Sequence, residues 1–141
     1  MKPTLKPLLQ AALLLASAGA TSLALAANPR TPADYSAAYD TCMNATSTTG
    51  GMVDCTASET QRQDARLNAN YQNGMKGLDP KQRTAMRNAQ RLWIQFRDAD
   101  CALERGLTGG TIDRINAQVC LLQMTKTRAD DLAVRFQPQD R

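Results

Sequence analysis

The four cysteines are the residues whose chemistry this sequence predicts most directly. Cys42, Cys55, Cys101 and Cys120 all lie beyond residue 26, in a chain of 141 residues. An even number of cysteines in a small exported domain is typical of two disulfide bonds. A zinc site is the alternative, but the chain contains no histidine and the cysteine spacings match no zinc pattern. We therefore expect two disulfides and no metal.

Two features of the helices favour different pairings of these cysteines. Cys55 and Cys101 lie at similar distances along the chain from the turn at Asp79, one before it and one after it. On neighbouring antiparallel helices they therefore stand at similar heights along the helix axes, which favours a bond between them. Helical phase instead turns Cys55 away from the Leu67 and Tyr71 face, because nine residues separate it from Asp64. From that side Cys55 reaches the preceding segment. We follow the phase and predict bonds Cys42–Cys55 and Cys101–Cys120; a break in the helix at Cys55 would favour the other pairing.

Catalytic chemistry finds little support in the sequence. There is no histidine to act as a base, no Gly-x-Ser-x-Gly motif and no glycine-rich phosphate loop. The carboxylate pairs Asp98/Asp100 and Asp130/Asp131 are close neighbours on helices, so their side chains point in different directions. We expect a protein without enzymatic activity and without a cofactor.

Four polar side chains lie on or beside the inward stripes of their helices, where charges are normally avoided: Asp64, Asn68, Arg97 and Arg128. They form either a structural polar network that sets the register of the helices or a binding site. We expect the structural network. An arginine beside a core needs a partner, and we predict that Arg97 pairs with Asp64 or with another acid on the core side.

The stretch 86–101 carries the only tryptophan and predicts the central helix. At helical spacing Met86, Trp93 and Phe96 share one stripe, while Gln90, Arg97 and Cys101 lie on its flank. Because aromatic residues are scarce, we expect Trp93 and Phe96 to form the core together with Leu67 and Tyr71 of the preceding helix.

Capping signals place the remaining helices. One helix begins at Thr49 or near Thr56 and ends near Gly77, and Asp79-Pro80 begins the central helix, which ends near Gly106. Thr111 caps a last helix that Pro138 ends. Residues 32–43 form a short helix or coil, and no segment alternates with a period of two. The fold is predicted as all-α: an antiparallel three-helix bundle with a short N-terminal helix or coil, stapled by two disulfides.

The N-terminal segment has the pattern of a targeting signal. Lys2 and Lys6 precede an apolar run that ends in Ala24-Leu25-Ala26, which predicts a secretory signal peptide over 1–26. The alternative is a membrane anchor, but the small residues favour cleavage. Residues 27–32 are then a disordered lead and 33–137 the folded domain. The formal charge of +4 includes both lysines, so the remainder carries about +2. We expect a periplasmic or secreted protein with no nucleic-acid partner and no membrane contact after cleavage.

Several motifs together resemble one known family. They are Cys55, DARLNANY at 64–71, AQRLWIQFRDADC at 89–101, Gly109-Gly110, Cys120, Thr125 and Arg128. This combination resembles the lysozyme-inhibitor LprI-like family, formerly known as a domain of unknown function, over about 42–136. The resemblance implies an exported, helical, cysteine-bridged protein and, for one branch, inhibition of lysozyme. Gly50-Gly51 departs from the family pattern, so the helix there is expected to start late.

Two loops are candidate binding surfaces, 44–51 and 106–111. A disulfide at each loop would hold it in shape and lower the entropy cost of binding. Arg105, Thr108 and Thr111 could offer hydrogen-bond donors to the paired carboxylates of a glycosidase cleft. We expect a protein that binds and inhibits a lysozyme-type glycosidase; the alternative is a structural or envelope-stress protein that binds another partner in the cell envelope. The sequence leaves the oligomeric state open.

Overall fold

The computed structural model describes residues 34–137 of the chain. Its elements are α1 (Ala37–Asn44), α2 (Thr49–Lys76), α3 (Pro80–Leu103), the 3-10 turn η1 (Glu104–Gly106) and α4 (Ile112–Arg135). No strand occurs in this part of the chain, which confirms the all-α prediction. The predicted signal peptide and the lead at 27–32 lie outside the described residues. Within them, no helix is both long and apolar enough to cross a membrane.

Local capping explains where the long helices begin. Thr48 caps α2 by accepting a hydrogen bond from the Gly51 backbone N–H at 3.0 Å. Gly51 itself lies so close to the Thr46 side chain that a Cβ atom there would overlap it. The glycines therefore stand inside the first turn of α2, and the expectation of a late start was wrong. At α3, Asp79 and Gln82 form a capping box on either side of Pro80, at the predicted start of this helix.

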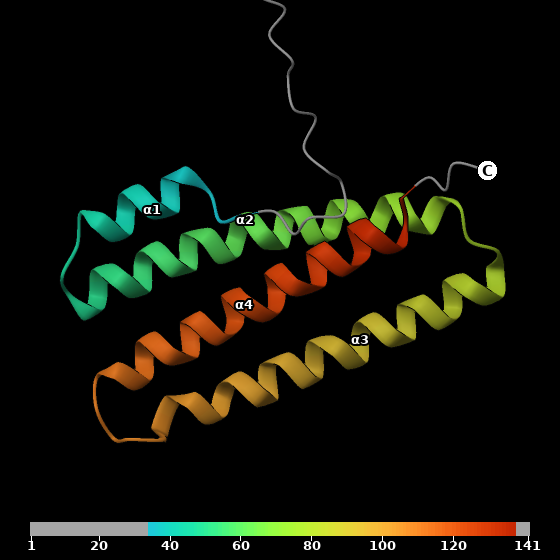
Figure 1. The fold of residues 1–141 in the computed structure, drawn as a ribbon. Helices are drawn as coiled ribbons and strands as arrows, with labels where there is room; N and C mark the ends of the chain where they lie inside the picture. Colours follow the sequence, from blue (N-terminus) through green and yellow to red (C-terminus); the bar gives the residue numbers. More distant parts are fainter. Residues whose placement is uncertain (1–33, 138–141) are drawn as a thin grey trace, which may run out of the picture.

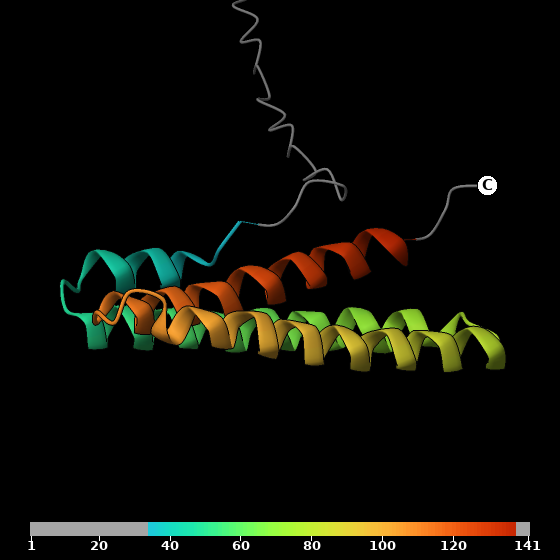
Figure 2. The ribbon, with the colours of Figure 1, turned by 90° about the horizontal axis from the view of Figure 1, so that it is seen from below.

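The three long helices run alternately up and down, with α4 between α2 and α3 (Figure 1). α1 doubles back along the N-terminal half of α2. Seen at right angles, the C-terminal half of α4 rises out of the level of α2 and α3 (Figure 2). α4 packs on both α2 and α3, most extensively on α2. The central helix is therefore α4, and the prediction that the stretch 86–101 is central was wrong.

The apolar core is small. Leu67, Met86, Ala129 and Leu132 form its buried cluster, and Tyr71 and Trp93 are partly buried against it. Phe96, in contrast, is 59% exposed, so its predicted place in the core was wrong. Phe96 is exposed because α3 is rotated about its own axis relative to the predicted orientation.

The buried side of α3 combines one residue of the predicted stripe with its flank. It carries Met86 of the stripe and Gln90 and Cys101 of the flank, and Arg97 is half-buried beside them. α3 has apolar residues on two neighbouring faces, and the face that reaches α4 is the one that places Cys101 against Cys120. Phe96 is thereby turned outward.

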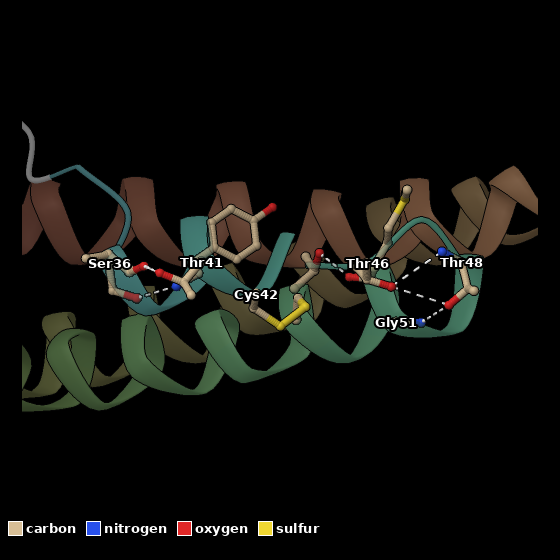
Figure 3. The surroundings of a disulfide bond; sticks show 11 residues. Ser36, Thr41, Cys42, Thr46, Thr48 and Gly51 are labelled. Carbon is tan, nitrogen blue, oxygen red and sulfur yellow. Dashed lines mark hydrogen bonds between the residues drawn. A yellow bond between two sulfur atoms is a disulfide. The ribbon is translucent and has the colours of Figure 1, made fainter. Parts of the chain in front are cut away.

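Both predicted disulfides are present. Cys42–Cys55 joins α1 to α2 with Cα atoms 5.7 Å apart (Figure 3). Cys101–Cys120 joins the end of α3 to α4 with Cα atoms 5.5 Å apart. The helix-phase argument therefore gave the right pairing: α2 is continuous through Cys55, which faces α1 rather than α3. Each bridge closes a short loop and stabilises the fold by roughly 3 kcal/mol.

A close approach at Gly74 yields a first prediction. The ring of Phe136 lies where a Cβ atom of residue 74 would stand. Gly74→Ala should therefore lower the free energy of unfolding by about 1–3 kcal/mol, although alanine is the better helix former. Gly50→Ala is the matched control in the same helix, because no atom lies within 4 Å of its added Cβ. It should stabilise by up to about 1 kcal/mol in urea unfolding. Equal effects of the two substitutions would contradict the packing described.

Candidate functional site

The connection between α3 and α4 is an exposed loop built over one buried carboxylate. Every residue from Arg105 to Ile112 is exposed, whereas Asp113 beneath them is only 2% exposed. The Asp113 carboxylate accepts hydrogen bonds from the Thr108 hydroxyl at 2.7 Å, from the Thr108 backbone N–H at 3.1 Å and from the Gly109 N–H at 2.9 Å. The tip of the loop is thus tied to the first turn of α4.

The loop backbone is shaped by these bonds. The Thr108 hydroxyl also accepts from the Gly110 N–H at 3.2 Å. Gly109 has φ +73°, a left-handed conformation that costs other residues about 1–2 kcal/mol. The hydrogen bond from the Thr108 hydroxyl, aided by the backbone N–H groups, holds the pKa of Asp113 below its usual value despite burial. The carboxylate is therefore ionised at neutral pH, and in this form it accepts the hydrogen bonds that organise the loop.

The disulfide Cys101–Cys120 clamps the base of this loop. Both sulfur atoms also lie near the Met124 Sδ, at 3.6 and 3.9 Å. The bridge and the Asp113 hydrogen bonds together hold the loop in one shape. In general, preorganisation of a surface loop lowers the entropy cost of association.

The three residues predicted to bind a partner have different positions. Arg105 is exposed and borders a shallow hollow of about 280 Å³ together with Val53, Arg114 and Gln118. Thr108 turns its hydroxyl inward to Asp113, so its role is to shape the loop. Thr111 is exposed at the N-cap position of α4 but makes no capping bond with its side chain. Of the three, Arg105 is the one whose side chain is both charged and at the edge of a hollow.

The predicted polar residues do not form one network. Asn68 donates to Asp64 at 2.9 Å along α2, and Arg128 donates to Gln90 at 3.1 Å between α4 and α3. Arg97 does not pair with Asp64. It pairs with the exposed Asp98 at 2.8 Å and donates to the Thr125 hydroxyl at 3.3 Å.

The prediction of a core-side acid for Arg97 was therefore wrong, because α3 stands apart from α2. The gap between them is an open groove of about 610 Å³, with Asp64 and Asn68 on one wall, Arg97 and Asp98 on the other, and Leu121 of α4 between them. Arg97 also lies over the Trp93 ring, with its guanidinium carbon 5.0 Å from the ring centre, and the guanidinium carbon of Arg128 lies 5.8 Å from the same centre.

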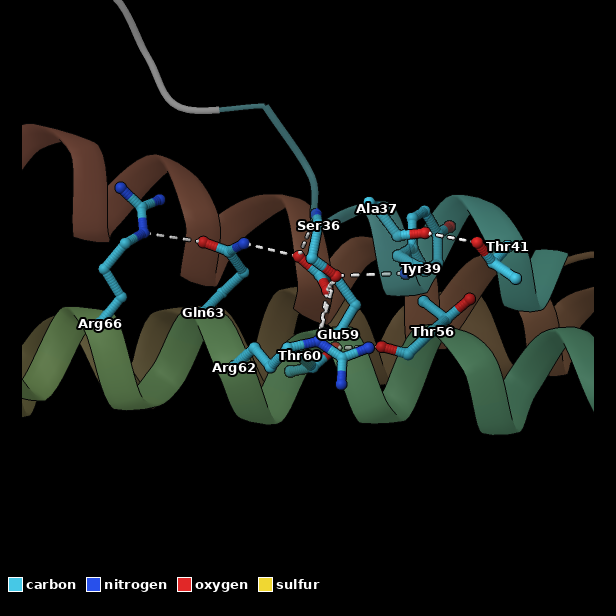
Figure 4. Close-up of polar contacts among 10 residues, drawn as sticks. All are labelled: Ser36, Ala37, Tyr39, Thr41, Thr56, Glu59, Thr60, Arg62, Gln63 and Arg66. Carbon is cyan, nitrogen blue, oxygen red and sulfur yellow. Dashed lines mark hydrogen bonds and ion pairs between the residues drawn. The ribbon is translucent and has the colours of Figure 1, made fainter. Parts of the chain in front are cut away.

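A buried glutamate that the sequence did not single out as an anchor holds α1 in place (Figure 4). Glu59 of α2 is fully buried, and it accepts hydrogen bonds from the Ser36 N–H at 3.1 Å and the Ser36 hydroxyl at 2.6 Å. Arg62 and Gln63 donate to the same carboxylate at 2.8 and 2.7 Å. Burial alone would raise the pKa of Glu59, but these donors outweigh it and lower the pKa to about 2.

A second ion pair ties α2 to α4. Arg66 pairs with Asp130, which also pairs with Lys126 at 2.9 Å. Burial opposes ionisation of Asp130, but the hydrogen bonds from Lys126 and Arg66 lower its pKa. Lys126 also lies over the Tyr35 ring, 5.7 Å from its centre. Within residues 34–137 no group of three or more metal-ligating side chains is found.

Glu59 gives a second prediction. Glu59→Gln should lower the free energy of unfolding by about 1–3 kcal/mol, since one buried acceptor oxygen becomes a donor facing Ser36. The carboxylate pKa is depressed from 4.5 to about 2, so its stabilisation is present above pH 4.5 and is lost as the pH falls toward 2. Urea unfolding between pH 7 and 2 measures both effects. The control is Asp54→Asn, at an exposed position of α2. It should change the free energy of unfolding little, and the variant should still lose stability in acid as the wild type does.

Asp113 gives a third prediction. Asp113→Asn should loosen the loop, because one carboxylate oxygen that accepts from Thr108 and Gly109 becomes an amide donor. Hydrogen exchange of the Thr108 and Gly109 amides should accelerate, while exchange in α2 stays unchanged. Because the Asp113 pKa is lowered, the wild-type loop should loosen in the same way only at a pH below the usual aspartate range. Unchanged exchange at both amides would show that Asp113 does not hold the loop.

Comparison with known proteins places this fold in a family. Residues 42–132 match the family described as "Lysozyme inhibitor LprI", a span that includes both disulfides, α2, α3 and most of α4. No curated protein and no solved structure matches the chain. The matched span covers well over half of the sequence. The chain therefore belongs to the LprI lysozyme-inhibitor family.

Proposed function

We propose that this protein is exported and inhibits a lysozyme-type glycosidase by presenting the loop 105–111 to the enzyme's substrate cleft. Membership of a lysozyme-inhibitor family supports the class of activity. The observation that carries the choice of surface is the exposed loop held from below by the buried Asp113. A fixed, protruding segment suits a concave site, because it is already in shape before binding.

The chemistry of the loop fits such a cleft. Glycosidases carry paired carboxylates beside the scissile bond. Arg105 offers a guanidinium whose donors can meet a carboxylate in a two-point geometry. Arg114 lies near it at the edge of the same hollow and adds positive charge. Leu107, 65% exposed at the loop, supplies an apolar contact beside these cations.

An inhibition assay tests this proposal and gives a fourth prediction. The purified oxidised protein should slow lysis of bacterial cell walls by at least one lysozyme type. Arg105→Ala should weaken the inhibition about tenfold or more, as expected for the loss of one charge-assisted contact worth about 1.4 kcal/mol. Arg91→Ala is the charge-matched control, because Arg91 is exposed on α3 away from the loop.

Two results would count against the proposal. Full inhibition by the Arg105→Ala variant would exclude the loop as the contact surface. No inhibition of any lysozyme type by the wild-type protein would exclude the activity.

The groove between α2 and α3 favours a second candidate, binding of cell-wall glycan. Its walls offer the carboxylates of Asp64 and Asp98 and the donors of Asn68 and Arg97, groups that suit sugar hydroxyls. Co-sedimentation with purified peptidoglycan distinguishes the two functions. Binding that Asn68→Ala abolishes, without inhibition of lysozyme, would favour this candidate over the first.

A further inference from the structure

α3 carries a continuous apolar stripe on its exposed side. Six apolar residues follow one another at alternating spacings of four and three residues, and all six are exposed: Ala85, Ala89, Leu92, Phe96, Ala99 and Leu103. The three large side chains among them are 64%, 59% and 66% exposed. Exposed apolar side chains that line up in this way mark an interaction surface more often than scattered ones do.

The stripe is separate from the face that holds α3 in the fold. Met86, Gln90 and Cys101 face α4, whereas the stripe is centred about 130° around the helix from them, at about 100° per residue. α3 contacts α4 and η1 but makes little contact with α2. The spacing of four and three residues is the pattern by which two helices pack along a seam.

The order of side chains along the stripe fits a second copy of the same helix running in the opposite direction. When a two-fold axis at the level of residue 94 relates the two copies, Leu92 faces Phe96 of the second copy. In the same arrangement Ala89 faces Ala99 of the second copy. Ala85 then faces Leu103 of the second copy. Large side chains meet at the centre, small ones meet on either side of it, and at each end a large side chain meets a small one. Every layer of the stripe therefore places an apolar side chain against an apolar side chain.

The charges of α3 favour the same orientation. Residues 80–91 contain Lys81, Arg83, Arg87 and Arg91 and no acid, whereas residues 92–104 contain Asp98, Asp100 and Glu104 against one arginine. This distribution opposes the macrodipole of the helix, which favours acids at the N-terminus and bases at the C-terminus. Most of these charges lie on the side of α3 away from the stripe, at about 100° per residue, so they act on the orientation at longer range. An antiparallel copy places each basic half alongside an acidic half, whereas a parallel copy would place like charges alongside each other.

The flanks of the stripe add little repulsion. Asn88, Gln95 and Ala102 border it on one side and are neutral, and Asp100 on the other side stands at the level of the neutral Asn88 of an antiparallel copy. About 60% of each large side chain is exposed, roughly 120 of about 200 Å², so the six large side chains of two stripes offer roughly 700 Å². With the exposed alanines the two stripes would bury on the order of 1,000 Å² together, which is near the lower limit for a specific interface. An interface of this size suits a dimer that dissociates on dilution.

We propose that the exposed stripe of α3 is a homodimer interface in which two copies of α3 pack antiparallel about a two-fold axis at the level of residue 94. The Ile94 side chain itself lies on the opposite side of α3 from the stripe. The 24 residues of α3 extend about 36 Å, so the loops 105–111 of the two copies lie at opposite ends of the dimer. Each loop stays free to engage its own partner. The dimer does not depend on the inhibitory function proposed above.

Sedimentation velocity of the oxidised protein tests the proposal and gives a fifth prediction. From about 1 to about 100 µM the apparent mass should rise from monomer to dimer. Leu92→Lys and Phe96→Glu, each alone, should remain monomeric over this range with unchanged far-UV circular dichroism. Ile94→Glu is the control: it replaces an exposed apolar residue of α3 off the stripe, and it should dimerise like the wild type.

Mixing the Leu92→Lys and Phe96→Glu variants tests the orientation. In an antiparallel pair the introduced lysine of one variant would meet the introduced glutamate of the other, while the remaining Leu92 and Phe96 meet as before, so the mixture should dimerise. In a parallel pair the new charges would face apolar residues and the mixture would stay monomeric. A wild type that is monomeric at every concentration, a dimer that survives both substitutions, or a mixture that does not dimerise would overturn the proposal.

Discussion

The packing of α2 against α4 is the contact on which the rest of the structure depends. Its surfaces are built mostly of small and polar residues: Thr56, Gln63 and Gly74 on α2 and Ala117, Thr125 and Ala129 on α4 are all buried. Small side chains let two helix backbones approach closely, and the ion pair of Arg66 with Asp130 bridges the helices at the edge of this contact. α1 and α3 are then attached to this pair rather than to each other, each by one disulfide.

The scarcity of large apolar residues explains why buried carboxylates have structural roles here. The chain has one tryptophan and two phenylalanines, and one of the phenylalanines is turned outward. Glu59 and Asp113 hold neighbouring segments in place through hydrogen bonds, a role that apolar packing has in a larger core. Each is buried, each accepts several hydrogen bonds, and each organises the segment beside it. Both remain ionised at neutral pH because the donors around them outweigh the effect of burial on the pKa.

Local signals in the sequence predict much of the fold and only part of the candidate site. The capping box at Asp79 placed the start of α3, and the helical phase of Cys55 selected the right disulfide. The rotation of α3 could not be predicted, because apolar residues lie on two of its faces and periodicity alone does not say which face is buried. Asp113 had a usable signal, since an acid in the first turn of a helix can accept from the free N–H groups before it. Glu59 had none, because its partner Ser36 lies 23 residues away and meets it only through the fold of α1.

The loose attachment of α3 has a consequence for how the surfaces are used. A three-helix bundle that closes fully buries one stripe of each helix, and no large apolar surface is left over. Here α3 touches α4 with one face and leaves a second apolar face exposed, while α2 and α3 stay apart across an open groove. The disulfide at Cys101 keeps α3 in place without the closure that a larger core would enforce. The loop at one end and the long face of α3 are therefore both available for interactions, and neither needs to unfold to be used.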